Sequence, residues 1–399
     1  MLKPQVLFTV DNEFNRCVRL KNQVETLIKS GIDCHVIDFQ FGRKTGIKFR
    51  EVSSVHVYTV CAPPFMQHFR TLSAEFPIFQ WFVRNRLNKI IQLHNLNPIA
   101  VHCYNTFAWK GVFHCFSKKH KAKLIVDFAE DLPSIMREYD YVKHGIGRLL
   151  VNLGRWDRLQ AHAVANSDKC IVVTSNAASD YVKRYGVQKS KFLVIDNLPS
   201  MELIEESTRE EYEEKDGFSL LYFGDTSVRR GTDLLIRTAP RIKSHIFDYQ
   251  VIIVGHNNRE QTKLESMIQQ LGCSNYVSLE GFQPEIKLPK YMKRSSLGAS
   301  PLKRNQHHDT THANKLFQFM LGRLPLIVSD CTAQSDLVLN NNLGVVFEAD
   351  NDESFIQTMI DVHSRHEERG IWSRNALEFT KKHTLAKVVA PYGNYLSTL

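Results

Sequence analysis

A cluster of histidines precedes an apolar helix pattern in the stretch HHDTTHANKLFQFMLG, residues 307–322. His308 and His312 are four residues apart, a spacing that lets two imidazoles bind one metal ion on a helix. The Asp-Thr-Thr between them instead indicates a polar loop ahead of a helix that begins near Asn314. The free N–H groups at that helix start, with Lys315 beside them, favour a phosphate over a cation. The stretch therefore predicts a phosphate contact and no bound metal.

A second group of candidate residues lies in the turn within YFGDTSVRRGTDLLI, residues 222–236. Gly224 and Thr226 follow a predicted strand, and Arg230 lies just before a predicted helix. Glycine lets a ligand approach the backbone, while a guanidinium and free helix N–H groups attract a phosphate. Gly255 and Phe282 follow two later strands, where a base or ribose could pack. Ordinary turn residues are the alternative interpretation at each of these positions.

Short β-branched runs alternate with helical patterns along the whole chain, which predicts an α/β fold. Residues 1–198 contain one such series and predict a parallel sheet wrapped by helices. A second series begins at residue 217. We therefore expect two tandem Rossmann-like doubly wound domains facing across a cleft. Ligands bind beyond the carboxyl ends of the strands in such sheets, which is where the candidate residues fall.

The expected domain boundaries follow from the same pattern. Residues 1–198 form an N-terminal Rossmann-like domain, and the acidic stretch 199–216 is a linker. Residues 217–381 form a C-terminal Rossmann-like domain. Residues 382–399 are a C-terminal segment that could cross back to the first domain.

Composition limits the class of protein. With 399 residues, 43% of them hydrophobic, the chain is typical of a globular protein of two domains. Its eight cysteines form no Cys-x-x-Cys pair, which argues against a zinc ribbon or a disulfide framework. No apolar run approaches a membrane span and no signal peptide is apparent, so we expect a cytoplasmic location.

The net charge of +9 is concentrated in the first half of the chain, which favours an anionic partner. The segments 65–90 and 141–160 mix Phe, Trp and Leu with Arg and Lys, as do helices that rest on an anionic membrane surface. Helices packed inside the domain are the alternative interpretation. Nucleic acid is not expected, because the aromatic residues are not interleaved with Gly-rich binding motifs.

Several blocks carry a resemblance to a known family. The runs LLYFGDTSVRRGTDLLI, VIIVG, VSLEGFQPEIKLPKYMKRSSLGASPL and ANKLFQFMLGRLPLIVSD resemble, in order and spacing, the family-4 retaining glycosyltransferases of the GT-B superfamily. In the first half the likeness is looser and includes RLKNQVETLIKSGIDCHVIDF and VDFAEDLPS. The resemblance implies sugar transfer from a nucleotide-sugar donor, a UDP- or GDP-sugar, with retention of anomeric configuration and with neither a metal nor a cofactor.

The resemblance also implies that the N-terminal domain (1–198) binds the acceptor and the C-terminal domain (217–381) binds the nucleotide sugar, and it assigns site residues. Arg230 would neutralise the diphosphate and, with Lys315, serve catalysis. Thr310 and Gln318 stand where the family has two glutamates that face the donor sugar and the ribose. The donor-binding set is then Gly224, Thr226, Arg230, Gly255, Phe282, Thr310, Asn314, Lys315 and Gln318. The expected acceptor-binding residues are Asp11, Asn12, Asp127 and Glu130.

The function expected from these residues is a retaining glycosyltransferase that acts on a glycan or lipid-linked acceptor in surface polysaccharide synthesis, lipopolysaccharide or capsule. It would lie in the cytoplasm, peripheral on the inner face of the membrane. Two alternatives stay open at this level: a non-catalytic homologue that binds a nucleotide or a partner protein, and a sugar-nucleotide epimerase. The base, the sugar, the acceptor and the linkage are not predicted.

Overall fold

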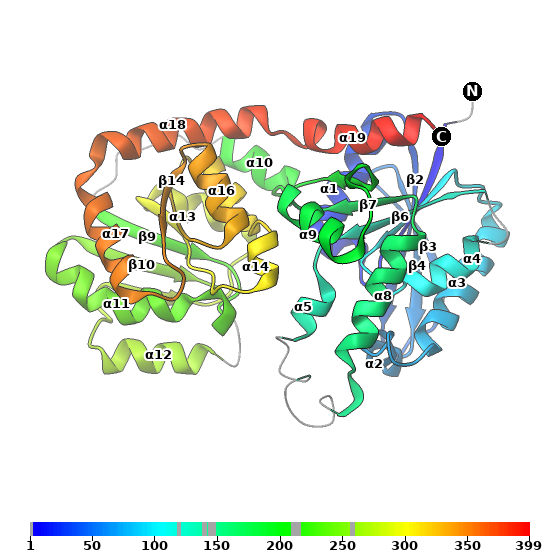
Figure 1. The fold of residues 1–399 in the computed structure, drawn as a ribbon, viewed down its shortest axis with the longest axis horizontal. Coiled ribbons are helices and arrows are strands. Elements are labelled where there is room, and N and C mark those ends of the chain that lie inside the picture. The colour runs from blue at the N-terminus through cyan, green and yellow to red at the C-terminus, as the bar shows by residue number, and fades with distance from the viewer. Residues whose placement is uncertain (1–2, 118–120, 138–141, 143–148, 209–216, 256–259) are drawn as a thin grey trace. The chain divides into compact units, whose positions relative to one another are not determined.

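The structure is a computed structural model that describes the chain except for residues 1–2, 118–120, 138–141, 143–148, 209–216 and 256–259. It divides into two compact units. The first consists of Met1–Asp196 with Leu385–Leu399, and the second of Asn197–Thr384. Each unit is a sheet with helices packed on it (Figure 1).

The first unit has a sheet of eight strands in the order β3-β4-β2-β1-β5-β6-β7-β8. All neighbouring strands are parallel except β3, which is antiparallel to β4 at the edge. The strands are β1 (Gln5–Thr9), β2 (Asp33–Phe41), β3 (Gly46–Val52), β4 (Val55–Ala62), β5 (Ala100–Tyr104), β6 (Lys123–Phe128), β7 (Lys169–Val172) and β8 (Phe192–Val194).

The helices of the first unit mostly lie between successive strands, as crossover connections require. They are α1 (Val18–Lys29), α2 (Phe65–Thr71), α3 (Ile78–His94), α4 (Trp109–Phe116), α5 (Leu132–Met136), α8 (Leu153–Asn166), α9 (Ser175–Tyr185) and α19 (Leu385–Ser397), with 3₁₀ turns η1 (Phe14–Arg16) and η2 (Lys189–Lys191). The tryptophans Trp109 and Trp156 are fully buried in the core of this unit.

The second unit has six parallel strands in the order β11-β10-β9-β12-β13-β14. Numbered from the first strand of the unit, this order is 3-2-1-4-5-6, the Rossmann arrangement. The strands are β9 (Phe218–Phe223), β10 (Tyr249–Val254), β11 (Val277–Glu280), β12 (Leu297–Ser300), β13 (Leu326–Ser329) and β14 (Gly344–Phe347).

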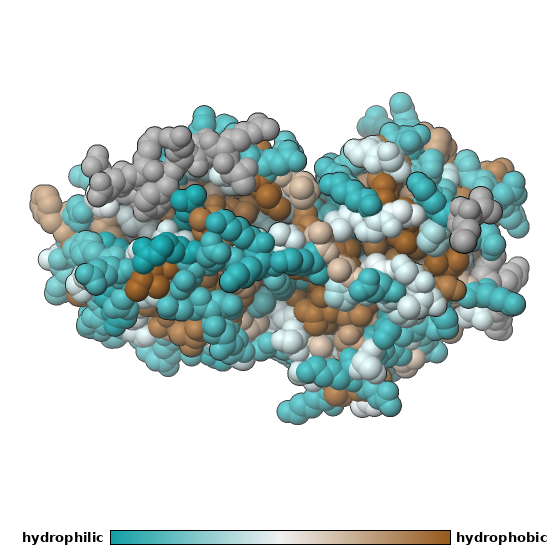
Figure 2. Space-filling model, turned by 90° about the horizontal axis from the view of Figure 1, so that it is seen from above, coloured by the Kyte–Doolittle hydropathy of each residue, from teal (hydrophilic) through white to brown (hydrophobic). Residues whose placement is uncertain are grey.

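The second unit's helices are α10 (Met201–Thr208), α11 (Thr232–His245), α12 (Gln261–Gln270), α13 (Leu288–Lys293), α14 (Gln306–Thr310), α15 (Asn314–Leu321), α16 (Thr332–Asn340), α17 (Asp352–Ser364) and α18 (His366–Lys382). Two 3₁₀ turns, η3 (Val228–Arg230) and η4 (Glu285–Lys287), follow strands β9 and β11. On α18 only Trp372 and Ala376 are buried. Figure 2, seen from the side on which this helix lies, accordingly shows mostly hydrophilic residues over it.

The strands anticipated from the sequence are present, because strands buried on both faces read as continuous apolar runs. All six residues of β9 and five of the six of β10, for example, are buried. The structure corrects three expectations. β3 breaks the all-parallel sheet that residues 1–198 predicted. Part of the expected linker forms α10, which packs on α15. Residues 306–310, expected as a loop, form the short helix α14.

Candidate functional site

The candidate donor site lies at the point in the second sheet where the order in which strands are added reverses direction. Strands β9 and β12 are neighbours there, and the chain winds outward from them to both edges of the sheet. The segments that follow the two strands touch, because the amide of Lys303 donates to the carbonyl of Arg229 at 3.1 Å. Such a switch point is where open α/β sheets bind nucleotides.

Glycines let the backbone segments at this point pack closely. Gly224 has φ of +133° and Gly255 has φ of +157°, both in the region that side chains disfavour. A Cβ on Gly255 would lie 1.7 Å from the carbonyl oxygen of Gly224. A Cβ on Gly231 would lie 1.8 Å from the carbonyl oxygen of Pro301. Gly255 therefore serves the packing of two strand ends against each other.

Lys315 is the most unusual residue of the site. It is only 6% exposed, and its Nζ has no hydrogen-bond partner among the described residues. The Nζ lies 3.4 Å from the centroid of the Tyr222 ring and 3.6 Å from where a Cβ of Gly224 would stand. Burial, assisted by the nearby positive charge of Arg230, holds the pKa of the Lys315 ammonium well below its usual value. An anion bound beside it would reverse that shift.

Arg230 ends the 3₁₀ turn η3 directly before α11. Its Nε lies 3.8 Å from Oδ2 of Asp225, and its side chain is 24% exposed. Asp225 shapes the turn, because its carboxylate accepts from the amide and the hydroxyl of Ser227 at 3.1 and 2.7 Å. Thr226 is buried in the same loop. Arg230 thus lies at the surface of the site, in a loop that the hydrogen bonds between Asp225 and Ser227 stabilise.

The histidines of the first-noted stretch are separated by the end of α14. His308 is buried, and its Nδ1 is 2.6 Å from the carbonyl oxygen of Lys303, whereas Nε2 of His312 is 3.2 Å from that of Ala333. Burial and the nearby arginines lower the pKa of His308 to about 4. Its Nε2 has no hydrogen-bond partner among the described residues. His308 therefore offers a neutral ring, with Nδ1 bound to the backbone.

Thr310 and Asn314 flank the start of α15. The hydroxyl of Thr310 donates to the carbonyl of Gln306 at 3.0 Å. Asn314, the first residue of α15, is exposed. Phe282, beyond β11, is 74% exposed. The structure therefore leaves these positions at or near the surface of the second unit.

Gln318 makes a contact that sequence reasoning missed. Its Nε2 donates to Oε1 of Glu285 at 2.7 Å. Glu285 lies in η4 beyond β11, and burial raises the pKa of its carboxyl group, with a further contribution from Glu202. A carboxylate therefore lies beside the position where the family has a ribose-binding glutamate. No signal in the sequence linked residues 33 positions apart.

Two of the four expected acceptor residues follow β1. Asp11 is buried, and Nη1 of Arg70 donates to its Oδ2 at 2.8 Å. Burial raises the pKa of Asp11, although Arg70 opposes the shift. Asn12 is exposed, and its Oδ1 accepts from the amide of Glu13 at 2.9 Å.

The other two expected acceptor residues lie near the end of β6: Asp127 is in the strand, and Glu130 comes two residues after it. Asp127 is fully buried, and its carboxylate accepts from Arg19 at 3.0 and 3.1 Å and from Gln23 at 2.8 Å. Arg19 also donates to the carbonyl of Ile195 at 2.6 Å. Glu130 is half-buried at the loop that follows β6. Asp127 is thus tied to α1, whereas Glu130 reaches the surface.

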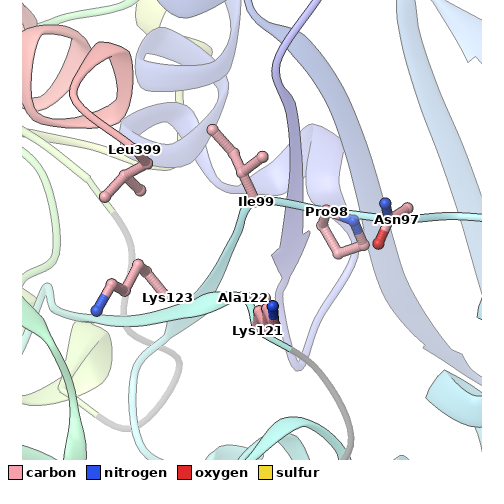
Figure 3. Close-up of a pocket in the computed structure, with 7 residues that line it drawn as sticks. All are labelled: Asn97, Pro98, Ile99, Lys121, Ala122, Lys123 and Leu399. Atoms are coloured by element: carbon pink, nitrogen blue, oxygen red, sulfur yellow. The ribbon is translucent and has the colours of Figure 1, made fainter.

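A pocket of about 450 Å³ opens elsewhere in the first unit (Figure 3). It is lined by residues at the amino ends of β5 and β6, among them Ile99 and Lys123, and by Leu399. Lys123 Nζ donates to Asp168 at 2.9 Å. Because sheets of this class bind their ligands beyond the carboxyl ends of the strands, this pocket is not the candidate active site.

Comparison with known proteins agrees with the arrangement of strands. Sucrose-phosphate synthase from Thermosynechococcus elongatus has a TM-score of 0.73 at 12% identity, over 99% of both chains. WaaG, a glycosyltransferase involved in lipopolysaccharide biosynthesis, has a TM-score of 0.67 at 14% identity, over 98% of this chain and 99% of that chain. The chain has the GT-B fold.

A third GT-B structure, Anabaena HepE in complex with UDP and glucose, has a TM-score of 0.66 at 14% identity over 99% of this chain and 100% of that chain. Residues 217–365 match the family model of glycosyl transferases group 1. All of the candidate donor residues lie within this matched segment. No curated protein sequence matches the chain. The family model thus supports a glycosyltransferase function through residues 217–365, and the solved structures show the fold.

Membrane association was expected from the segments 65–90 and 141–160. None of the described helices combines the length and the apolar character that crossing a bilayer requires. Trp81 and Phe65, on α3 and α2, are 60% and 56% exposed. Residues 141 and 143–148 of the second segment lie outside the described residues, and Leu149 and Leu150 are exposed.

Proposed function

We propose that the protein is a retaining, metal-independent glycosyltransferase of family 4 that takes its sugar from a UDP- or GDP-sugar. The observation that carries the proposal is Lys315, a buried amine without a hydrogen-bond partner among the described residues, at the switch point of the second sheet. Burying a cationic group without a partner is costly, so a resident anion is the simplest reason for its position. A diphosphate supplies that anion.

In the proposed complex the diphosphate lies against Gly224, with Lys315 on one side and Arg230 on the other. Binding raises the pKa of Lys315, so that the side chain becomes an ammonium beside the phosphate. The start of α15 adds backbone N–H groups to the same charge. Asp225 pairs with Arg230 before the donor binds and leaves the guanidinium to the phosphate afterwards.

The reaction then breaks the bond between the anomeric carbon and the leaving phosphate oxygen. The acceptor hydroxyl forms the new bond on the same face of the sugar, and its proton passes to a leaving phosphate oxygen. Lys315 and Arg230 stabilise the charge that develops on the diphosphate. Removing one such donor typically costs a factor of about 10²–10³ in kcat.

Glu285 takes the role that the ribose-binding glutamate has in the family. We place its carboxylate against the ribose hydroxyls, with Gln318 holding it in position by the 2.7 Å hydrogen bond. His308 offers Nε2, and Thr310 its hydroxyl, to the transferred sugar. Gly255 and Thr226 shape the loop behind the diphosphate, while Phe282 and Asn314 form the rim.

In the first unit, Asn12 and Glu130 contact the acceptor in our proposal, because both reach the surface. Asp11 and Asp127 hold the loops that carry them, through Arg70 and Arg19. The acceptor is a glycan or a lipid-linked sugar of a surface polysaccharide. The protein works in the cytoplasm, and the apolar and basic surface of α2 and α3 rests on the membrane.

Thermal shift with UDP, GDP and ADP tests the proposal. One of these should raise the melting temperature, and Arg230→Ala should abolish the shift. The unchanged protein should also slowly hydrolyse the nucleotide sugar that carries the nucleotide that raises its melting temperature. A shift without any turnover of a nucleotide-sugar panel would favour a non-catalytic homologue that binds a nucleotide. The absence of a shift with every nucleotide would overturn the proposed glycosyltransferase and leave only a homologue that binds a partner protein.

A further inference from the structure

Two strands of the first sheet, β2 and β4, bring three metal-binding side chains together at their amino ends. His35 on β2 lies directly opposite His56 on β4, so the two imidazoles share one face of the sheet. Asp33 is two residues before His35 on β2 and therefore lies on the same face. One ligand atom from each of these three side chains lies within 4.8 Å of the other two.

The hydrogen bonds around His35 fix its protonation. Oε1 of Gln5 accepts from the amide of Asn97 at 2.8 Å, so Nε2 of Gln5 is the donor that lies 2.9 Å from Nε2 of His35. The His35 Nε2 atom therefore carries a lone pair. Its Nδ1 holds the proton and donates to the Tyr58 hydroxyl at 3.1 Å.

This tautomer leaves two acceptors facing each other. The lone pair of His35 Nε2 is 3.1 Å from Oδ2 of Asp33, and Nε2 of Gln5 is shared between them, at 3.3 Å from the same carboxylate oxygen. The Gln5 amide thus occupies the one lone pair of His35 Nε2, and a cation would displace that amide to bind the imidazole and the carboxylate together. The ring of His56 stacks on that of His35, with centroids 4.8 Å apart, and is only half-buried, so it can turn to supply a third ligand.

We propose that Asp33, His35 and His56 form a binding site for a divalent transition metal, with Zn²⁺ as the preferred ion. Two imidazoles and one carboxylate suit zinc, whose bonds to them are about 2.0–2.2 Å long. The hydrogen bond from His35 to Tyr58 is the outer support that orients a metal-binding imidazole. Glu51 is the residue of β3 directly opposite His56.

The role of this site is structural. It lies at the amino ends of β2 and β4, whereas the candidate active-site residues follow the carboxyl ends of strands. A bound ion would join β2 to the β3–β4 hairpin, whose turn residues Ser53 and Ser54 both have positive φ, at 49° and 66°. Two adjacent serines in that conformation weaken the turn, so a cross-link here would stabilise the edge of the sheet.

The test uses untagged, full-length protein from which metal has been removed with a chelator. Zn²⁺ binding is measured by calorimetry, and Co²⁺ binding by its visible absorption, whose intensity reports a tetrahedral site. We expect one ion per chain at this site and a higher melting temperature with Zn²⁺. His56→Ala should weaken binding by about 100-fold or more, since loss even of an outer-shell partner costs 10–100-fold.

Asp33→Asn is the second variant, because it keeps the size of the side chain and removes its charge. His68→Ala, on the exposed side of α2, is the matched control and should bind as the unchanged protein does. The proposal is overturned if the unchanged protein shows no saturable binding at high micromolar Zn²⁺. It is equally overturned if His56→Ala and Asp33→Asn, folded by circular dichroism, bind as His68→Ala does.

Discussion

The Nζ atom of Lys315 lies 3.4 Å from the centroid of the Tyr222 ring, near Gly224, the residue that follows the end of β9. An aromatic face is a weak partner for an ammonium, worth roughly 0.5–2 kcal/mol. It holds the side chain in place without the hydrogen bonds that a phosphate oxygen would supply. The ring therefore keeps the amine in position for a ligand.

Lys315→Met should stabilise the protein in the absence of nucleotide and abolish its response to nucleotide. The lowered pKa means that the folded chain binds fewer protons than the unfolded chain below the usual lysine pKa, so the group destabilises the fold there. Relieving a buried unpaired polar group returns about 1–3 kcal/mol, less what the ring contact supplied. Melting temperatures with and without UDP, GDP or ADP measure both effects. Lys263→Met, at a side chain that is 63% exposed, should change neither.

Affinity for the nucleoside diphosphate should fall as pH rises. Lys315 has a lowered pKa in the free protein and a raised one beside a phosphate, so binding takes up a proton. Affinity is full below the free-state pKa and decreases by up to about tenfold per pH unit above it. Calorimetry above pH 7.5, where the terminal phosphate with its pKa of about 6 is ionised, isolates this effect. A slope that persists in Lys315→Met would assign the proton to another group.

Glu285→Gln should remove the preference for a ribose over a deoxyribose nucleotide. The unchanged protein is expected to bind UDP more tightly than 2′-deoxy-UDP, because a carboxylate accepts strongly from hydroxyl groups. The ratio of the two dissociation constants measures this. If the ratio is the same in both proteins, Glu285 does not contact the ribose.

Gln318→Glu is the complementary change, since it restores the residue that the family has at this position. It would place a second carboxylate where the amide now lies 2.7 Å from Glu285. Like charges so close share a proton, so nucleotide affinity should fall as pH rises through the raised pKa of the pair. Tighter binding at pH 8 would instead show that Gln318 itself faces the ribose.

Asp127→Asn should destabilise the first unit by about 3–5 kcal/mol, because it leaves the buried guanidinium of Arg19 without a counter-charge. The midpoint of urea unfolding, followed by tryptophan fluorescence, measures the loss. Asp157→Asn breaks a surface pair with Arg137 at a side chain that is 42% exposed, and should change stability by less than about 0.5 kcal/mol. Equal midpoints for the two variants would mean that the Arg19 network contributes little.

Trp81→Ser should reduce binding to vesicles that contain anionic lipid. The side chain is 60% exposed on α3, and Arg84 on the same helix is exposed too, as suits a helix resting on a charged membrane. Sedimentation with vesicles measures the bound fraction. Phe247→Ser, at a 93% exposed position of the second unit, should leave binding unchanged. If the unchanged protein stays in the supernatant, α3 does not contact the membrane.

Much of the fold could be predicted because its signals are local. Helix α9 begins where the Thr174 hydroxyl accepts from the amide of Ala177 and ends at Gly186 with φ of 64°, and both residues are typical of those positions. The buried strands are continuous apolar runs. Gly224 and Lys315 were predicted as site residues because residues just after a strand, or just inside a helix, lie at one edge of the sheet.

What could not be predicted depends on distant parts of the chain. Whether β3 pairs parallel or antiparallel is decided by its neighbour and not by its own seven residues. Glu285 was not among the predicted site residues, and only the structure shows its carboxylate accepting a hydrogen bond from Gln318. Asp127 was predicted as an acceptor-binding residue, but its hydrogen bonds to Arg19, 108 residues away, could not be predicted. Side-chain partners at such separations carry no periodic signal.

Helix α19 bears on how the protein is made. It belongs to the first unit, where its Tyr392 hydroxyl lies 3.0 Å from Nδ1 of His102 and the helix packs on α1. During synthesis the ribosome releases β1 to β8 long before Tyr392 appears. The surface of α1 that α19 covers therefore stays uncovered until residues 385–397, which follow the whole of the second unit along the chain, have been synthesised.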